Sequence, residues 1–550
     1  MTTFFDRHRE LLEQAVEALK TREFWTPFPE IPSARFYGEN AKDKGQDDFN
    51  ALLGQAFELP GHPASCHVGQ ENSPWGLELG VSYPSASADE LLAASDAAAS
   101  GWAEASPETR VGVLLEALQR LNEQSFLLAH ATMHTTGQAF PMAFQAGGPH
   151  AQDRGLEAVA AAYAEMTFSA RSARWEKPQG KHAPIVLEKR WEIVPQGVSL
   201  AIACNTFPTW NSYPGIFASL ATGNAVIVKP HPKAILPLAL TVRVMREVLE
   251  EAGLPADAVL LAADEPGAEL TKTLAQAPAV KLIDYTGSSA FGDWLRANAS
   301  QAQLFSEETG VNSVVITATD DFKGMCANLA FSLSLYSGQM CTSPQNLYLP
   351  KQGIETDEGF KDLDAVVDGI VTAIDRLLGD ADRAAGVCGA IVNPAIIERV
   401  EQSRAAGQIV RDSGETGAGL SATPLLVKLD NANSDTQANE CFGPIAFVVP
   451  CEDAAEAIEK ASGLAAQKGA ITAALYATDS ALIEAASKAF VRAGVNLSIN
   501  LTGNIYVNQS AAFSDFHVTG ANPAGNASLT DTAFVASRFR RVMIRWPGGD

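Results

Sequence analysis

The sequence lacks the features that mark a membrane, nucleic-acid or secreted protein. No apolar run is long enough to span a bilayer. Basic side chains are in the minority, with 40 Lys and Arg against 64 Asp and Glu and a net charge of −24, so no broad basic surface is left to meet phosphates. The first ten residues carry charges and no apolar segment of signal length. We therefore expect no nucleic-acid partner and no membrane partner.

Cysteine is scarce, with seven residues scattered over 550. This excludes a disulfide framework and favours the reducing cytoplasm. Two histidine groups fall short of metal sites. No fourth ligand follows His62, Cys66 and His67 at zinc spacing. His130 and His134 lack the glutamate that a zincin places directly after its first histidine, so we interpret them as packing or surface residues. We predict no metal site.

The chain alternates short apolar runs with helical periodicity, and 550 residues are too many for one core. A doubly wound parallel sheet is predicted because strand and helix follow each other at crossover spacing. A second α/β domain begins near Phe305. The expected strands of the first sheet are 198–204, 224–228, 259–262 and 280–285, and those of the second are 314–317, 345–350, 425–428, 446–449, 473–477 and 495–500.

Other elements are expected outside these sheets. Amphipathic or Ala-rich patterns predict helices over 6–20, 88–103 and 107–129, the last opened by Ser106 as cap and by Pro107. Residues 175–195 predict a protruding hairpin, and 539–546 a final strand that docks on another element. The stretch 24–80 is rich in Pro and Gly and predicts an ordered, irregular lead-in.

The most informative stretch is Ser337-Gly338-Gln339-Met340-Cys341, after an expected helix over 320–336 and before a short strand. Glycine lets the backbone bend sharply here, so Cys341 would sit on a tight polar turn. The turn alone leaves two interpretations open: a catalytic thiol or a small buried residue.

Polar groups follow the strands of the first sheet. Asn205, Lys229 and the run 285–288 lie at expected carboxyl ends, which is where doubly wound sheets bind ligands. The Gly-x-Gly-x-x-Gly dinucleotide fingerprint is absent after each of these strands. The pattern favours a nucleotide site without proving one.

Six motifs in this order resemble those of the aldehyde dehydrogenase superfamily, over about residues 100–550. They are Asn205-Thr206-Phe207-Pro208, the Lys-Pro segment 223–230, Tyr285-Thr286-Gly287-Ser288 with Gly292, Glu308-Thr309-Gly310, Gly338-Gln339-Met340-Cys341 and Glu440-Cys441-Phe442-Gly443-Pro444. The segments 72–76 and 515–520 look most like the aldehyde dehydrogenases of phenylacetic acid degradation. Some of those carry a fused hydratase domain; this sequence ends at Asp550, and we expect no such domain.

The resemblance implies a covalent mechanism. Cys341 would attack an aldehyde carbonyl, and Asn205 with the backbone N–H of Cys341 would stabilise the oxyanion. Glu308 would activate the water that releases the acid. Glu307 is also a candidate because the two acids are adjacent, but Glu308 is preferred since Gly310 then follows two residues later, as the family pattern requires.

The resemblance also implies a nicotinamide cofactor. Lys229 would bind the adenosine ribose, the turn and helix after 285 the pyrophosphate, and the segment after Glu440 the nicotinamide ribose and ring. The expected cofactor residues are Lys229, Gly287, Ser288, Gly292, Glu440 and Phe442. Relatives that prefer NAD place a Glu three residues after the Lys. Here Pro232 stands there, so repulsion against a 2′-phosphate is missing and NADP is favoured over NAD.

The resemblance implies an α/β aldehyde dehydrogenase fold with a Rossmann-like cofactor domain, an α/β catalytic domain and a small β oligomerisation element. The expected ranges are an amino-terminal lead-in at 1–82, the NAD(P)-binding domain at 83–173 and 196–305, the catalytic domain at 306–510, and the oligomerisation element at 174–195 and 511–550. We therefore expect a homodimer or homotetramer. The implied substrate is an aldehyde, most specifically a CoA-linked semialdehyde from phenylacetate ring opening.

Three alternatives remain. A CoA-acylating dehydrogenase would pass the acyl group to CoA, but such relatives usually lack the general-base Glu. A cysteine hydrolase of esters or thioesters would need Cys341, Asn205 and an acid, and would leave Lys229 and Glu440 idle. A silent binding protein would be expected to have lost Cys341 or Glu308, and both are present.

Overall fold

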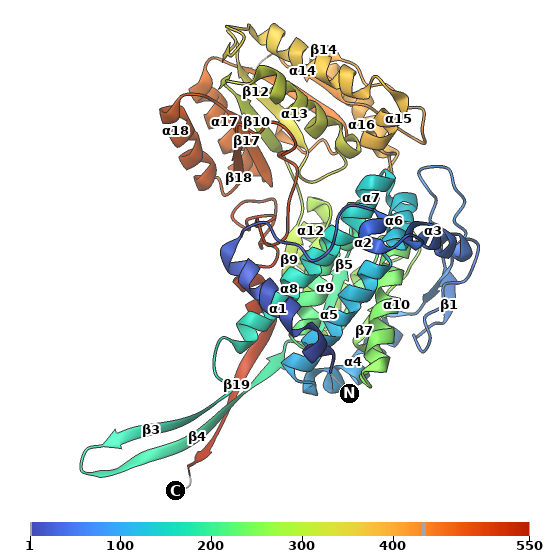
Figure 1. Cartoon of the computed structure of the whole chain (residues 1–550), viewed down its shortest axis with the longest axis vertical. Coiled ribbons are helices and arrows are strands. Elements are labelled where there is room, and N and C mark those ends of the chain that lie inside the picture. The colour runs from blue at the N-terminus through green and yellow to red at the C-terminus, as the bar shows by residue number, and fades with distance from the viewer. Residues whose placement is uncertain (1–2, 431–435, 549–550) are drawn as a thin grey trace.

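The computed structural model describes residues 3–430 and 436–548. Its two largest sheets each have helices around them (Figure 1). The first sheet is parallel throughout, in the order β7-β6-β5-β8-β9. This confirms the doubly wound prediction. Its strands are β5 (Val198–Ile202), β6 (Val226–Lys229), β7 (Val259–Leu261), β8 (Val280–Thr286) and β9 (Gln303–Glu307), and its crossover helices are α9 (Pro208–Ala221), α10 (Leu236–Glu251), α11 (Leu270–Gln276) and α12 (Ser289–Asn298).

Five further helices pack beside this sheet. They are α4 (Ala88–Glu104), α5 (Pro107–Glu123), α6 (Ser125–Thr136), α7 (Phe140–Gly147) and α8 (Pro149–Thr167). Ser106 caps α5 as predicted, accepting the Thr109 N–H. The prediction of a single helix over 107–129 is wrong, because α5 ends before Gln124 and a second helix, α6, begins after it. The Ser125 hydroxyl donates to the Asn122 carbonyl there, at 2.7 Å, and competes with the helical ladder.

The second sheet has seven strands in the order β14-β15-β16-β12-β10-β17-β18, and only the edge pair β14–β15 is antiparallel. It confirms the second α/β unit and lies above the first sheet in Figure 1. Its strands are β10 (Asn312–Ile316), β12 (Pro344–Pro350), β14 (Gln408–Arg411), β15 (Leu425–Lys428), β16 (Ile445–Cys451), β17 (Thr472–Tyr476) and β18 (Asn496–Ile499). Its helices are α13 (Phe322–Ser334), α14 (Leu363–Leu378), α15 (Ala381–Cys388), α16 (Ala395–Ser403), α17 (Ala454–Lys468) and α18 (Ser480–Arg492), and a short pair, β11 (Ala318–Thr319) and β13 (Glu355–Thr356), lies apart.

The lead-in packs on the helices beside the first sheet and, around His62 and Ser85, contacts the β7 edge. It comprises α1 (Phe4–Thr21), α2 (Ala34–Tyr37), α3 (Ala41–Leu52), β1 (Cys66–Val68) and β2 (Tyr83–Ser85). His62 Nε2 accepts the Leu261 N–H at 2.9 Å, and the Ser85 hydroxyl donates to the Ala263 carbonyl at 2.9 Å. An exposed strand edge invites pairing with other chains, so the lead-in closes that edge.

Glu71 joins the lead-in to α10. Its Oε1 accepts the N–H groups of Ile235 and Leu236, at the amino end of the helix, while Tyr83 donates to its other oxygen. The carboxyl therefore satisfies backbone donors that the helix leaves unpaired. Burial raises the pKa of Glu71 to about 7.

A three-stranded antiparallel arm extends from the body, in the order β19-β4-β3 (Figure 1). It consists of β3 (Ser172–Gln179), β4 (His182–Pro195) and β19 (Phe539–Pro547). The predicted hairpin is confirmed, and the predicted final strand pairs with it. The segment before β19, which includes α19 (Thr532–Ala536), packs on the first sheet, where Arg538 binds Asp284 at 2.6 Å.

In the described part of the chain, no helix is long and apolar enough to cross a membrane.

Candidate active site

Cys341 follows a turn whose backbone is held in an uncommon conformation. Tyr336, Ser337 and Gly338 have φ values of 52°, 49° and 62°, a left-handed run that side chains disfavour. The Ser337 hydroxyl donates to the carbonyls of Cys388 and Ala422, at 3.0 and 2.7 Å. The turn is therefore held by contacts from distant parts of the chain.

Gly310 and Gly338 allow their backbone to approach other carbonyl groups closely. A Cβ on Gly338 would lie 2.1 Å from the Gly443 carbonyl oxygen, and one on Gly310 would lie 2.1 Å from the carbonyl oxygen of Cys341. Asn312 donates its side-chain amide to the same Cys341 oxygen at 2.8 Å. These contacts fix where the thiol emerges.

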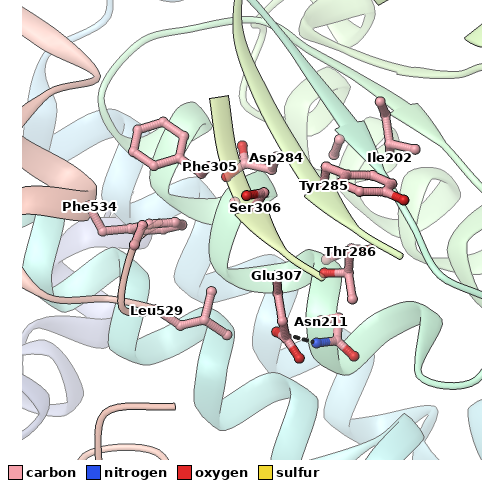
Figure 2. Close-up of a pocket in the computed structure, with 14 residues that line it drawn as sticks. Ile202, Asn211, Asp284, Tyr285, Thr286, Phe305, Ser306, Glu307, Leu529 and Phe534 are labelled. Atoms are coloured by element: carbon pink, nitrogen blue, oxygen red, sulfur yellow. Dashed lines mark hydrogen bonds between the residues drawn. The ribbon is translucent and has the colours of Figure 1, made fainter. Parts of the chain in front are cut away.

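The Cys341 thiol meets an imidazole and a carboxylate. Its Sγ lies 3.8 Å from His517 Nε2, and the same nitrogen lies 3.2 Å from Glu307 Oε1. Glu307 and His517 are 4% and 3% exposed. The His517 ring packs edge-on against Trp210, with centroids 4.7 Å apart. The second Glu307 oxygen accepts the Asn211 amide at 3.0 Å, the contact drawn in Figure 2.

The charges at this cluster oppose a resting thiolate. Burial and the neighbouring Glu307 carboxylate raise the pKa of Cys341 well above its ordinary value. Burial also works against ionisation of Glu307, but His517, through its charge and hydrogen bond, and Arg154 bring the pKa of that carboxyl below its ordinary value. The cluster therefore pairs a neutral thiol with an ionised carboxylate. Three atoms that could ligate a metal lie within 4.8 Å of one another here, but they already contact each other, and we assign no metal to them.

Glu308 faces the other way. Its two carboxylate oxygens accept from Arg296 at 2.5 and 2.9 Å. A Cβ on Gly292 would lie 2.4 Å from the Glu308 carboxyl carbon, so the group rests on the first turns of α12. The sequence favours Glu308 as the base, but in the structure it is Glu307 that lies beside the thiol cluster. The reason is that successive side chains along an extended strand point to opposite faces.

The predicted oxyanion residue and the amide that reaches the cluster are different asparagines. In the part of the chain that is described, the Asn205 side chain makes no hydrogen bond, and it is partly buried after β5. Asn211, in α9, binds Glu307, and its Oδ1 accepts from Cys204 Sγ at 3.6 Å. Sequence reasoning missed Asn211, although its place in the helix after the Asn-x-Phe-Pro segment pointed to the same strand end.

At the β6 end, Lys229 is buried and paired. Its Nζ donates to Asp264 Oδ1 at 2.6 Å and to the Pro230 carbonyl at 2.7 Å. Burial lowers the pKa of Lys229 and raises that of Asp264, against the attraction between them. Asp264 follows β7 and was not singled out from the sequence.

The turn after β8 presents the amino end of α12. Ser288 caps this helix, its hydroxyl accepting the Phe291 N–H at 3.4 Å. Gly287 donates its N–H to the Glu307 carbonyl at 3.1 Å, and its missing side chain leaves room for the Tyr285 ring. The free N–H groups of such a helix end suit a diphosphate.

Glu440 and Phe442 belong to the segment that contacts the thiol turn through Gly443 and Gly338. Glu440 Oε1 accepts the Gly310 N–H at 3.0 Å, and burial raises the pKa of this carboxyl to about 7. Phe442 packs on Ile391 and Ile396. Gly310 thus lies between the carboxylate of Glu440 and the carbonyl of Cys341.

Comparison with known proteins identifies the family of the chain. A model of the aldehyde dehydrogenase family matches residues 80–527. The crystal structure of an NAD-dependent aldehyde dehydrogenase from Burkholderia multivorans is 50% identical, covers 100% of both chains and has a TM-score of 0.98. The 1-pyrroline-5-carboxylate dehydrogenase of Bacillus subtilis (strain 168) is 24% identical over 61% of this chain and 62% of its own length. That of Geobacillus sp. (strain WCH70) is 24% identical over 81% of each.

The chain belongs to the aldehyde dehydrogenase family, whose model covers most of it. The match spans less than two thirds of the Bacillus subtilis relative.

Proposed function

We propose that this member of the aldehyde dehydrogenase family oxidises an aldehyde to its acid, with a nicotinamide nucleotide as oxidant and Cys341 as nucleophile. The observation that carries the proposal is the contact of Cys341 Sγ with the buried His517, which in turn contacts Glu307. A thiol on a fixed turn with acid–base groups beside it suits covalent catalysis. The strand-end groups Lys229 and Ser288 fit a dinucleotide.

The chemistry has two stages. Cys341 gives up its thiol proton to Glu307, which passes it to solvent, and the sulfur adds to the aldehyde carbonyl carbon while the carbonyl π electrons move to oxygen. A nicotinamide nucleotide, which Lys229, Ser288 and Glu440 would hold, would supply the hydride acceptor for this carbon, and Cys341 would keep the acyl group as a thioester. Water then attacks the acyl carbon while Glu307 takes its proton, and the thiolate leaves with the bonding electrons.

Glu307 is our proposed base in place of Glu308. It lies within hydrogen-bond reach of the cluster around the thiol, whereas Glu308 is bound by Arg296. A general base must lie close to the proton that it abstracts. The lowered pKa of Glu307 keeps its carboxyl group ionised.

The oxyanion donors remain Asn205 and the Cys341 backbone N–H. Asn205 is supported by its place at a strand end and by its side chain, which makes no hydrogen bond within residues 3–430 and 436–548. Asn211 is less suitable because its side-chain amide donates a hydrogen bond to Glu307. Losing one oxyanion donor typically costs about 3 kcal/mol in barrier, so Asn205→Ala should lower kcat far more than KM.

Both nicotinamide nucleotides have support. The Burkholderia multivorans relative is NAD-dependent, which favours NAD. Pro232 stands where a ribose-binding carboxylate would repel a 2′-phosphate, which favours NADP. Parallel measurement of kcat/KM with each nucleotide decides between them, and Pro232→Glu should lower the value for NADP more than for NAD.

The arm supports self-association. Trp175, Ile185, Met543 and Trp546 are 38% to 46% exposed on its strands, and exposed apolar side chains of this size favour burial against a second copy. We propose a homodimer or homotetramer, to be tested by light scattering on a chain that ends before β19.

The substrate proposal rests on resemblance alone. We propose a CoA-linked semialdehyde from phenylacetate ring opening, and a cytoplasmic location based on the cysteine pattern. The domain ranges given above stand as proposals too.

Hydrolysis of esters or thioesters by the Cys341 thiol is the second candidate function. The cluster of thiol, imidazole and carboxylate groups favours it. Nicotinamide reduction over free and CoA-linked aldehydes, with and without free CoA, separates the cases. Reduction that needs no CoA supports the hydrolytic dehydrogenase, and reduction only with CoA supports the acylating form. Release of acid from thioesters without any nicotinamide reduction supports the hydrolase.

A further inference from the structure

Asp264 lies beside Lys229 at the carboxyl ends of two neighbouring parallel strands. Val228 of β6 and Leu261 of β7 are paired positions, and one step further the Ala262 N–H donates to the Val228 carbonyl at 2.8 Å. The two chains therefore leave the sheet side by side, and Lys229 Nζ donates to Asp264 Oδ1 at 2.6 Å. This contact fixes a carboxylate at the edge of the sheet where doubly wound folds bind nucleotides.

The two strand ends are held from neighbouring elements, and one carboxylate oxygen is left over. The Ser85 hydroxyl donates to the Ala263 carbonyl at 2.9 Å, and the Ala203 N–H donates to the Lys229 carbonyl at 3.0 Å. Within the described residues, Asp264 Oδ2 accepts no hydrogen bond, and the side chain keeps 6% of its surface exposed. Asp264 can therefore accept a hydrogen bond from a ligand without giving up Lys229.

The strand order places this ion pair on the adenosine side of the dinucleotide site. Ser288 caps α12 after β8, and the sheet order β7-β6-β5-β8-β9 puts β6 two strands away, about 10 Å. Glu307, beside the thiol, ends β9 on the other side of β8. A diphosphate at the amino end of α12, with its nicotinamide half toward the thiol, therefore directs its adenosine half toward β6 and β7.

The charges at the ion pair distinguish the two nicotinamide nucleotides. NAD has a 2′-hydroxyl on its adenosine ribose that can donate to a carboxylate, whereas NADP carries a 2′-phosphate there. Two anions in one buried place are costly unless a cation is free to pair with them. Lys229 is already neutralised by Asp264. His231 carries no charge at neutral pH, since burial lowers its pKa to about 4, and Lys233 is exposed, where salt screens its charge.

We propose that Asp264 receives the 2′-hydroxyl of the adenosine ribose and makes this site selective for NAD over NADP. It takes the place of the carboxylate that Pro232 leaves out, and it reaches the ribose from the end of β7 instead of from the loop after β6. The proline at position 232 therefore does not make NADP the preferred nucleotide. The inference rests on the proposed function for the presence of a nicotinamide dinucleotide, and it adds which dinucleotide the chain takes.

The test is the affinity of the purified protein for NAD and for NADP, measured by isothermal titration calorimetry without aldehyde. The wild type should bind NAD at least about tenfold more tightly than NADP, because like charges oppose each other in a buried site. In Asp264→Asn the amide keeps an oxygen for Lys229 but loses the negative charge. NAD should then bind more weakly and NADP more tightly, and the preference for NAD should fall at least about tenfold.

Glu265 offers the matched control, since it is the next carboxylate along the chain and is exposed. Glu265→Gln should leave both affinities within about twofold of the wild type, because solvent screens an exposed charge. Opposite changes of the two affinities in Asp264→Asn identify a role in selectivity, since damage to the fold would weaken the binding of both nucleotides.

Wild-type protein that binds NADP as tightly as NAD, or that binds neither, would overturn the proposal whether or not Asp264→Asn folds. An unchanged preference in folded Asp264→Asn would overturn it as well. The outcome is separate from that of the proposed function. Selective binding of NAD that depends on Asp264, without oxidation of any aldehyde, would reject the dehydrogenase and keep this inference. Aldehyde oxidation with equal affinity for both nucleotides would do the reverse.

Discussion

The two faces of the chain at the end of β9 differ sharply, although one peptide bond separates Glu307 from Glu308. On the first face Glu307 meets His517 and Asn211 beside the thiol. On the second face Glu308 meets Arg296 on α12. One carboxylate contacts groups that can exchange protons, and the other contacts a permanent cation. The comparison teaches that strand direction, more than motif spacing, decides which acid can do chemistry.

Removing the thiol should have the largest effect, since it takes away what the first face acts upon. Cys341→Ala should lower aldehyde-dependent nicotinamide reduction by about 10⁴-fold or more, because no covalent adduct can form. Adding Glu307→Gln to this variant should lower the rate no further. Steady-state absorbance assays measure both, and substantial oxidation by Cys341→Ala would refute covalent catalysis.

Neutralising Glu307 and Glu308 separately tests directly whether the two faces differ in function. Glu307→Gln should lower kcat by about 10²–10⁴-fold, because a general base is lost. Glu308→Gln should lower kcat by less than about tenfold, since it removes an ion pair with a half-exposed Arg296. The two variants are matched in size and differ by one position. A larger loss in Glu308→Gln than in Glu307→Gln would reverse the assignment.

Glu71 sharpens the comparison because its buried carboxyl has no cationic partner among the residues that the structure describes. Its pKa rises from 4.5 to about 7 on burial, which corresponds to about 3 kcal/mol. Between those pH values the folded chain holds the proton and the unfolded chain does not. The free energy of unfolding should therefore fall as pH rises from about 4.5 to 7.

Glu71→Gln should remove this dependence, since an amide keeps an oxygen for the α10 N–H groups and has no charge to bury. Denaturant unfolding at pH 5 and pH 8 measures it for both proteins. Equal pH dependence in the wild type and the variant would show that Glu71 does not titrate as described.

A substitution at Gly310 tests the close approach of the segment after β9 to the Cys341 backbone. Gly310→Ala places a Cβ 2.1 Å from the Cys341 carbonyl oxygen, and should lower the free energy of unfolding by about 1–3 kcal/mol. Gly463, exposed within α17 and with no atom near its Cβ position, is the matched control. Gly463→Ala should raise stability by about 1 kcal/mol through helix propensity. Thermal melts compare them, and equal melting temperatures would contradict the close approach.

The fold was predictable where burial made the pattern simple. The strand over 425–428 has the same bounds in the structure, because a short, buried apolar run determines it. The break at Gln124 was not predictable, since neither Gly nor Pro marks it and a local Ser125 hydrogen bond makes it. Helices α7 and α8 were missed as well.

The site was predictable only in part. The Cys341 turn and the Gly310 segment are local motifs, and they lie where the sequence indicated. Asp264 follows its partner Lys229 by 35 positions, and His517 follows Cys341 by 176, so only the folded chain pairs them. The choice between Glu307 and Glu308 depends on how β9 sits beside β8, which residue spacing does not encode.

The most direct test is the intact mass of the enzyme after mixing with nicotinamide nucleotide and an aldehyde that the wild type oxidises. In Glu307→Gln we expect one burst of nicotinamide reduction and a stable acyl adduct on Cys341, because water can no longer be activated. Glu308→Gln should turn over without a lasting adduct. An acyl adduct that persists in Glu308→Gln but not in Glu307→Gln would contradict the account.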